Sequence, residues 1–255
     1  MPDADPVLLG RTDAIARIVL NRPAKRNALG PDLLRELSRA LAQTAADPQV
    51  RVVAISGAGK DFCAGADLAS VRGMAQAGPL ENIEDARALG EVFIAIRKHP
   101  RPVVALVQGR ALAGGCGLAT ACDVVLASES ARFGYPEVNI GFVPAMVSAI
   151  VRRCASEKRA FDLLASGDPI AARTALDLGL ITRVFADESF ENESDNYLAK
   201  LAGKSASALA MTKNALYHAD GMSFEAAIEA GAHLNALARA TEDCRRGMDK
   251  FLRKE

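Results

Sequence analysis

Short apolar runs alternate with longer amphipathic stretches along this chain, and the alternation predicts a mixed α/β protein. Runs of strand length, rich in branched residues, are typical of strands buried in a sheet. These runs occupy residues 52–56, 102–107 and 123–127, and shorter extended pieces are expected at 7–9, 14–20, 132–133 and 182–185. The pieces at 7–9 and 14–20 predict a hairpin-like start to the fold.

Apolar residues recur at helical spacing in the longer stretches. Pro31 opens one helix that should run to Ala46, because Asp47 and Pro48 stop it there. A second helix is expected from about Glu81 to Lys98, with an apolar face of Ile83, Leu89, Val92, Phe93 and Ile96. Further helices are expected from 141 to 153 and at 157–165, 171–178, 188–202, 205–219, 223–240 and 242–253. The chain should therefore end in an all-helical region.

Composition narrows the class of protein further. A length of 255 residues suits one domain, or one domain with a small appendage. The formal net charge is zero, which gives no indication of a nucleic-acid or anionic-membrane partner. The apolar runs are too short to cross a bilayer, and the N-terminus lacks the apolar segment of a secretory signal. Five single cysteines without metal-ligand spacing indicate reduced thiols, no metal site and a cytoplasmic location.

The most informative stretch is QGRALAGGCGLATACD, residues 108–123. An apolar strand run precedes it, small residues follow, and a helical pattern begins near Leu118. Free backbone N–H groups at such a helix start can bind an oxyanion or a phosphate. The order of the glycines fits neither a phosphate-binding loop nor a dinucleotide fingerprint. The alternative is a tightly packed strand–helix joint that needs small residues.

A second small-residue stretch, DFCAGADL at residues 61–68, follows another buried-strand run. It can expose a backbone N–H group at Ala66. Two such loops could each supply one N–H group to the same oxygen atom. Paired backbone donors of this kind form an oxyanion hole for a thioester or ester carbonyl.

Five segments together resemble the crotonase (enoyl-CoA hydratase/isomerase) superfamily, in family order and over nearly the whole chain. They are NRPAKRNAL (21–29), FCAGADL (62–68), the Gly114-Gly115 stretch, FGYPE (133–137) and TEDCRRGMDKFL (241–252). The resemblance implies a ββα-spiral core over residues 1–190 and a helical trimerisation region over 191–255. It also implies an acyl-CoA thioester substrate, no further cofactor, and assembly as a homotrimer or a dimer of trimers.

The resemblance also implies the catalytic groups. The backbone N–H groups of Ala66 and Gly114 would stabilise the thioester oxygen, and Glu137 of the FG-x-PE motif would be the general acid/base. The sequence by itself supports the role of Glu137 only in part. Glu137 follows a proline between apolar neighbours, where desolvation would raise its pKa. An ordinary surface glutamate is the alternative from sequence alone.

Residues that the resemblance places along CoA or the substrate form a larger set. They are Lys25, Arg26, Ala28, Ala64, Asp67, Leu68, Gly115, Gly117, Lys250 and Phe251. Some have simpler interpretations: Lys25 and Arg26 could form a solvated basic loop, and Asp67 could cap the next turn. Lys250 and Phe251 lie in the last helix, which in the family often closes the CoA pocket of a neighbouring subunit. Met74 could line the acyl pocket or simply fill a loop.

One position departs from the family pattern. Common enoyl-CoA hydratases hold water between two glutamates, and Gly117 occupies the position of the first. The two-carboxylate mechanism therefore does not carry over. A 2-enoyl-CoA hydratase that uses Glu137 alone is the favoured prediction. The alternatives are an enoyl-CoA isomerase with the same single glutamate and a non-catalytic acyl-CoA-binding protein.

Overall fold

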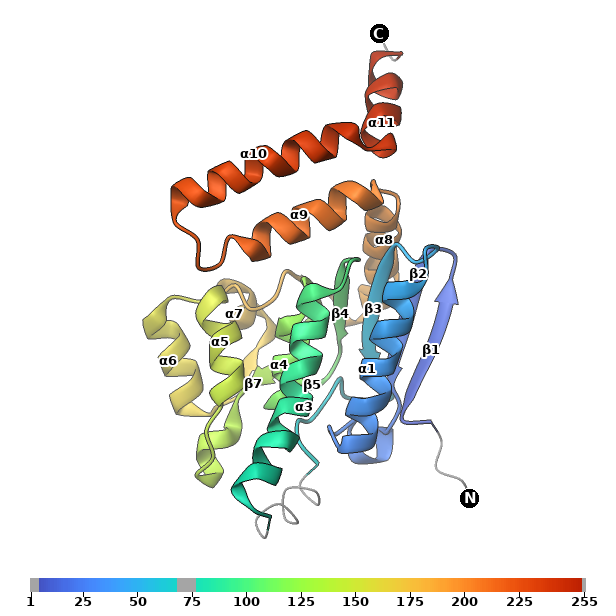
Figure 1. Ribbon diagram of the computed structural model, residues 1–255. Helices are drawn as coiled ribbons and strands as arrows, with labels where there is room; N and C mark the ends of the chain where they lie inside the picture. Colours follow the sequence, from blue (N-terminus) through green and yellow to red (C-terminus); the bar gives the residue numbers. More distant parts are fainter. Residues whose placement is uncertain (1–4, 68–76, 254–255) are drawn as a thin grey trace.

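A six-stranded mixed sheet forms the centre of the computed structural model, which describes residues 5–67 and 77–253 (Figure 1). Its strand order is β1 (Val7–Thr12), β2 (Ile15–Leu20), β3 (Val52–Gly57), β4 (Val103–Val107), β6 (Val124–Ser128) and β9 (Arg183–Phe185). The β1–β2 hairpin is antiparallel, and every other neighbouring pair is parallel. The predicted mixed α/β class and the hairpin start are confirmed.

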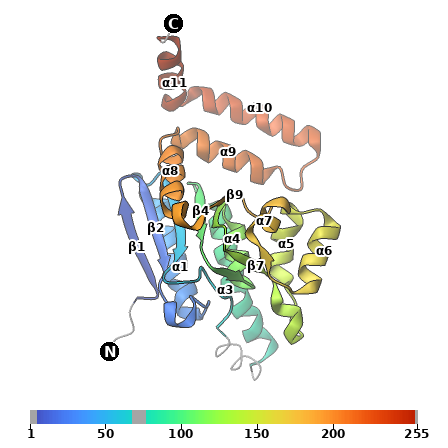
Figure 2. The ribbon, with the colours of Figure 1, turned by 180° about the vertical axis from the view of Figure 1, so that it is seen from behind.

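Helices cover both faces of this sheet because alternate strand residues point to opposite sides. Helices α1 (Pro31–Ala46), α3 (Pro79–Lys98) and α4 (Gly114–Ala121) share one core with residues such as Ile55 and Ala105. Helix α8 (Phe190–Ala202) covers the opposite face, where its Leu198 packs on Val104 and its sheet neighbours (Figure 2).

The helix predicted from Pro31 to Ala46 has those bounds in the structure. The apolar face expected for the second long helix is wrong at its beginning. Val92, Phe93 and Ile96 are buried, but Ile83 is 45% exposed because the N-terminal half of α3 extends past the sheet.

A second, three-stranded sheet was not predicted as a sheet. It consists of β5 (Arg110–Leu112), β7 (Arg132–Gly134) and β8 (Ile170–Ala171), in that order. Residues 110–112 were expected in the small-residue stretch after the strand, whereas they pair in parallel with β7. The remaining elements of this part are η1 (Pro23–Lys25), η2 (Pro136–Ile140), α5 (Ala145–Cys154), α6 (Glu157–Ser166), α7 (Ala172–Asp177) and η3 (Asp187–Ser189). Helix α5 begins later than predicted, since Gly141 is left-handed and ends η2 first.

Three C-terminal helices leave the sheet: α9 (Ala206–His218), α10 (Phe224–Ala240) and α11 (Glu242–Leu252). Helix α9 is joined to the core by the buried Lys213, whose Nζ atom lies 2.7 Å from Asp123 Oδ2 and 2.8 Å from the Ile96 carbonyl oxygen. Tyr217 donates to the other Asp123 oxygen at 2.6 Å. The predicted boundary near residue 190 falls at the start of α8, a helix that packs on the sheet. None of the described helices has the length and apolar content needed to cross a membrane.

Candidate active site

Two chain segments run side by side and end at Ala66 and Gly114. Cys63 forms a parallel bridge with Ala111, and the Leu112 N–H group donates to the Cys63 carbonyl oxygen at 3.0 Å. Ala66 lies three residues after Cys63 on one segment, and Gly114 lies three residues after Ala111 on the other. The register therefore brings the two predicted oxyanion donors to the same end of the paired segments.

Close packing at Gly65 holds these ends together. Gly65 has a φ of +93°, which L side chains rarely adopt. A Cβ atom added there would lie 2.8 Å from both the Ala113 Cβ atom and the Leu112 carbonyl oxygen. Ala113 itself has φ 51° and ψ −129°, a conformation that costs free energy in a residue other than glycine. Strain is thus held in the residue immediately before Gly114.

The two predicted donors are available for a ligand. Gly114 is the first residue of α4, so its N–H group has no partner within the helix and lies at the positive end of the helix dipole. Among the described residues, neither Gly114 nor Ala66 donates its backbone N–H group to a protein acceptor. Ala66 is also exposed. This arrangement can bind a carbonyl oxygen that gains negative charge.

Glu137 lies on a third segment, which is bonded to the segment that ends at Gly114. Strand β7 runs parallel to β5, and the Ala113 N–H group donates to the Gly134 carbonyl oxygen at 2.8 Å. Glu137 follows three residues later, on η2. It is partly buried, and its Oε2 atom is buried without a hydrogen-bond partner among the described residues. This burial raises the pKa of Glu137 above the ordinary glutamate value.

Gly117 lies in a tightly filled space. A Cβ atom there would lie 2.5 Å from Val147 Cγ1 and 2.9 Å from Phe93 Cζ. Gly115 is equally confined, since its Cβ atom would lie 2.4 Å from the Cys63 carbonyl oxygen. Both glycines are buried. Their predicted contact with substrate stays a prediction, but close packing at both positions favours glycine.

The loop that carries the predicted CoA contacts is bound to the loop that carries Ala66. The Ala64 N–H group donates to the Arg26 carbonyl oxygen at 3.0 Å. Asp67 pairs with Lys25 at 3.5 Å and with Arg22 at 3.0 Å. Arg22 also donates to the Ala28 carbonyl oxygen at 2.9 Å. The structure thus brings five of the predicted residues together, namely Lys25, Arg26, Ala28, Ala64 and Asp67.

Arg22 was not predicted as a site residue, because nothing local marks a residue whose acidic partner lies 45 positions away. The cap predicted for Asp67 concerns a turn outside the described residues. Leu68 and Met74 also lie outside the described residues. Arg26 has an exposed side chain and a left-handed backbone with φ 52°, so its interpretation as a solvated loop residue stays open.

Lys250 and Phe251 do not join the site within one chain. They lie on α11, which packs on α9 and α10 at the far end of the molecule (Figures 1 and 2). Phe251 is 73% exposed and borders an apolar groove with Cys244, Met248 and Leu252. A role for this helix in a neighbouring subunit's site remains a prediction.

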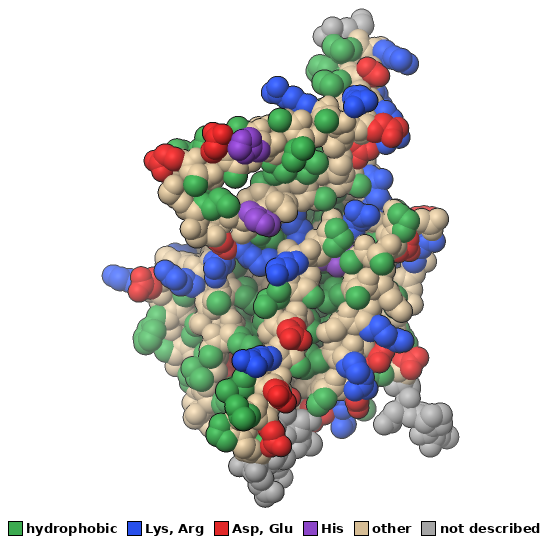
Figure 3. All heavy atoms as spheres, in the orientation of Figure 1, with side chains coloured by type: hydrophobic (Ala, Val, Ile, Leu, Met, Phe, Trp, Pro, Cys, Tyr) green, Lys and Arg blue, Asp and Glu red, His purple; other side chains and the backbone are tan. Residues whose placement is uncertain are grey.

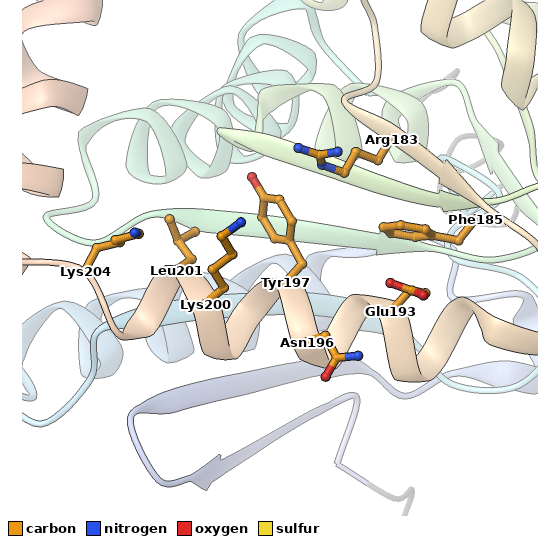
Figure 4. Close-up of a pocket in the computed structure, with 8 residues that line it drawn as sticks. All are labelled: Arg183, Phe185, Glu193, Asn196, Tyr197, Lys200, Leu201 and Lys204. Atoms are coloured by element: carbon orange, nitrogen blue, oxygen red, sulfur yellow. The ribbon is translucent and has the colours of Figure 1, made fainter.

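A separate cavity of about 410 Å³ lies between β9 and α8 (Figure 4). Arg183 and Phe185 border it from the strand, and Tyr197 and Lys200 from the helix. None of the segments that carry Ala66, Gly114 and Glu137 lines it. In the described part of the chain, no group of three or more His, Cys, Asp or Glu residues is arranged to hold a metal ion.

Comparison with known proteins gives consistent results. The sequence model of the family described as enoyl-CoA hydratase/isomerase matches residues 10–255. The chain is 34% identical to the 2,3-dehydroadipyl-CoA hydratase of Escherichia coli, over 97% of this chain and 96% of that protein. It is 36% identical to the rat mitochondrial enoyl-CoA hydratase domain-containing protein 3, over 85% of this chain and 72% of that protein. The crystal structure of an enoyl-CoA hydratase from Mycobacterium smegmatis superposes with a TM-score of 0.94 at 31% identity, covering 98% of this chain and 97% of that one.

Proposed function

The chain belongs to the enoyl-CoA hydratase/isomerase family, and from this premise we propose that it adds water to 2-enoyl-CoA thioesters. The crotonase fold expected from the sequence is confirmed by the structural match over almost the whole chain. The family processes acyl-CoA thioesters, and the hydratase names of the relatives support hydration as the reaction. The acyl-CoA itself is the substrate, and the proposed reaction needs no other cofactor or metal.

The observation that carries this proposal is the buried, unpartnered oxygen of Glu137. Its Oε2 atom is buried and unpartnered among the described residues, and its pKa is raised by burial. A structural glutamate would be expected to have an ion pair or hydrogen bonds that offset its desolvation. A carboxylate with a buried, unpartnered oxygen, on a segment bonded to the one that ends at Gly114, is instead suited to exchange protons with a ligand.

The proposed mechanism follows from these three groups. The N–H groups of Ala66 and Gly114 donate to the thioester carbonyl oxygen. The Glu137 carboxylate removes a proton from water as the water oxygen bonds to C3, and the electrons of the C2–C3 double bond move onto the carbonyl oxygen as an enolate. Protonated Glu137 then returns the proton to C2 as the enolate collapses. One water is consumed, and the carboxylate is restored.

Gly117 gives a specific reason to retain a second candidate, the isomerase. Packing by Val147 and Phe93 leaves no space for a second carboxylate at this position. An isomerase needs only one base: Glu137 would remove a proton from C2 of a 3-enoyl-CoA and return it to C4. The oxyanion donors would have the same role. A protein that binds acyl-CoA without turnover is the third possibility.

Turnover of 2-enoyl-CoA and 3-enoyl-CoA, measured in parallel with the mass of the product, tests the proposal. We expect 2-enoyl-CoA to gain one water, and Glu137→Gln to lower kcat by at least two orders of magnitude with little change in CoA affinity, since general acid–base catalysis contributes about 10²–10⁴-fold. Because the pKa of Glu137 is raised, the acid limb of the pH profile should lie above the ordinary pKa of glutamate. Activity should fall as the pH drops through this raised pKa, since the base becomes protonated.

Each alternative gives a different result in the same experiment. A product of unchanged mass with a displaced double bond would identify an isomerase. Binding of CoA esters without any turnover would identify a binding protein. Full activity of Glu137→Gln would show that the assignment of the acid/base is wrong.

The C-terminal helices support the further proposal of a homotrimer or a dimer of trimers. Within the described chain, α10 has no buried residue although it carries apolar side chains such as Phe224, 77% exposed, and Ile228, 60% exposed. Figure 3 shows apolar side chains on the outer surface of these helices. Contacts between copies of the chain would bury these side chains and the apolar groove of α11. A cytoplasmic location remains a prediction.

A further inference from the structure

Tyr135 is fully buried between the strand that leads to Glu137 and the helix that begins at Gly114. It is among the largest fully buried side chains of the protein. Its hydroxyl oxygen lies 3.1 Å from Thr120 Oγ1 on α4. The Cys116 thiol, one turn earlier on the same helix, lies near this hydroxyl. The phenol therefore lies beside two successive turns of α4.

The direction of the Tyr135–Thr120 hydrogen bond follows from the other contacts of Thr120. The Thr120 hydroxyl donates its one proton to a carbonyl of its own helix, since Cys116 O lies 2.9 Å away and Gly117 O 3.3 Å away. Every hydroxyl proton then has an acceptor if Tyr135 donates to Thr120, and we assign the bond in this direction. The result is a chain of hydrogen bonds from the Tyr135 hydroxyl through Thr120 to the backbone of α4.

Two contacts fix α4 against the segment that carries Glu137. The first is the backbone bond from Ala113 N–H to Gly134 O, 2.8 Å long, at the start of the helix. The second is the bond between Tyr135 and Thr120, about 10 Å farther along the helix at 1.5 Å per residue. Core packing already restrains the buried helix, and these two polar contacts join it directly to the Glu137 segment.

We propose that Tyr135 is a positioning residue that holds the Gly114 N–H group and the Glu137 carboxylate in one fixed relative geometry. The inference rests on the proposed function of those two groups. Filling the core would require only the ring, because a phenylalanine has nearly the same shape. The hydroxyl adds a buried polar group that needs a partner, and it finds that partner on the helix of the oxyanion donor. The hydroxyl therefore helps to set the direction of α4 relative to the segment that carries Glu137.

The chain offers a matched control far from this site. The Thr44 hydroxyl, buried in α1, lies 3.0 Å from the Ala40 carbonyl oxygen and 3.1 Å from His99 Nε2. Like Thr120, it belongs to a helix and is bonded to a side chain from another segment. The Thr44 link touches none of the segments that carry Ala66, Gly114 or Glu137. Its loss should affect stability alone.

The experiment compares steady-state kinetics and thermal unfolding of Tyr135→Phe, Thr120→Val and Thr44→Val in the full chain, with the enoyl-CoA that the wild-type protein turns over. We expect Tyr135→Phe and Thr120→Val each to lower kcat about tenfold, because misplacement of a catalytic group by about 1 Å can cost 10²-fold. KM should change less than twofold, since the predicted charged contacts of CoA, Lys25 and Arg26, lie on a different loop. Thr120→Ser should retain most of the activity, and Thr44→Val should lower Tm without lowering kcat.

The outcomes separate this inference from the proposed function. The positioning role is wrong if Tyr135→Phe retains kcat within twofold of wild type, or if Thr44→Val loses as much kcat at an equal loss of Tm. If Tyr135→Phe does not fold, Thr120→Val decides, because it removes the other end of the same bond and leaves the ring in place. A fully active Glu137→Gln variant would instead overturn the proposed function.

Discussion

Gly117 provides a quantitative test of whether a second carboxylate can be added to this site. Replacing Gly117 with alanine in α4 should gain about 1 kcal/mol of helix propensity. The new Cβ atom would lie 2.5 Å from Val147 Cγ1 and 2.9 Å from Phe93 Cζ. Both neighbours are buried in the main core, so neither can move freely. Overpacking of this kind costs about 1–3 kcal/mol.

The net expectation for Gly117→Ala is a loss of about 0–2 kcal/mol, which lowers Tm by up to about 8 °C in a chain of this size. Gly117→Glu should be far worse, because it adds a buried carboxylate without a partner, at a cost of several kcal/mol. We therefore expect Gly117→Glu to unfold or to lose activity, and not to gain hydratase activity.

A double variant identifies the cause of the loss. Val147→Ala removes the atom nearest to the new Cβ atom, so Gly117→Ala/Val147→Ala should be more stable than the sum of the single changes by about 0.5–3 kcal/mol. Thermal unfolding measures the coupling, and turnover of 2-enoyl-CoA measures the activity. If Gly117→Ala raises Tm and Gly117→Glu gains hydration activity, the site has room and the steric argument fails.

Two further predictions concern the C-terminal helices. Lys213→Met should lower the free energy of unfolding by about 3 kcal/mol, since it removes one partner of the buried pair with Asp123. Denaturant unfolding measures this loss, with Lys200→Met, at an exposed lysine, as the control. Equal stability of the two variants would contradict the prediction. Ile228→Asp should shift the assembly toward monomers in analytical ultracentrifugation, whereas Glu229→Gln, an exposed neighbour, should not. An unchanged sedimentation coefficient for Ile228→Asp would exclude α10 from the interface.

Local signals in the sequence predicted much of the fold. The first long helix has clear boundaries at Pro31 and Asp47-Pro48, and the structure follows them. Strand β5 escaped prediction because its three residues become a strand only by pairing with β7, which lies about twenty positions later in the chain. Ile83 was assigned to a buried face because helical spacing does not reveal where the sheet beneath the helix ends.

The candidate site, like the fold, could be predicted from the sequence only in part. Glu137, Ala66 and Gly114 were selected by resemblance, and the structure adds the register that brings their segments together. Arg22 was missed because its partner Asp67 is distant in sequence. The crowding at Gly117 could not be predicted either, since Val147 and Phe93 come from two other helices. Tertiary contacts decide each of these points.

The two proposed oxyanion donors are backbone N–H groups, and this has an evolutionary consequence. Codon changes at Ala66 or Gly114 alter side chains but, apart from proline, leave the amide group itself in place. The capacity to stabilise an enolate would then survive most point mutations that the packing tolerates. Glu137 has no such protection, since one substitution removes its carboxylate. Descendants of this scaffold can therefore acquire new reactions by exchanging proton-transfer side chains while inheriting the anion site.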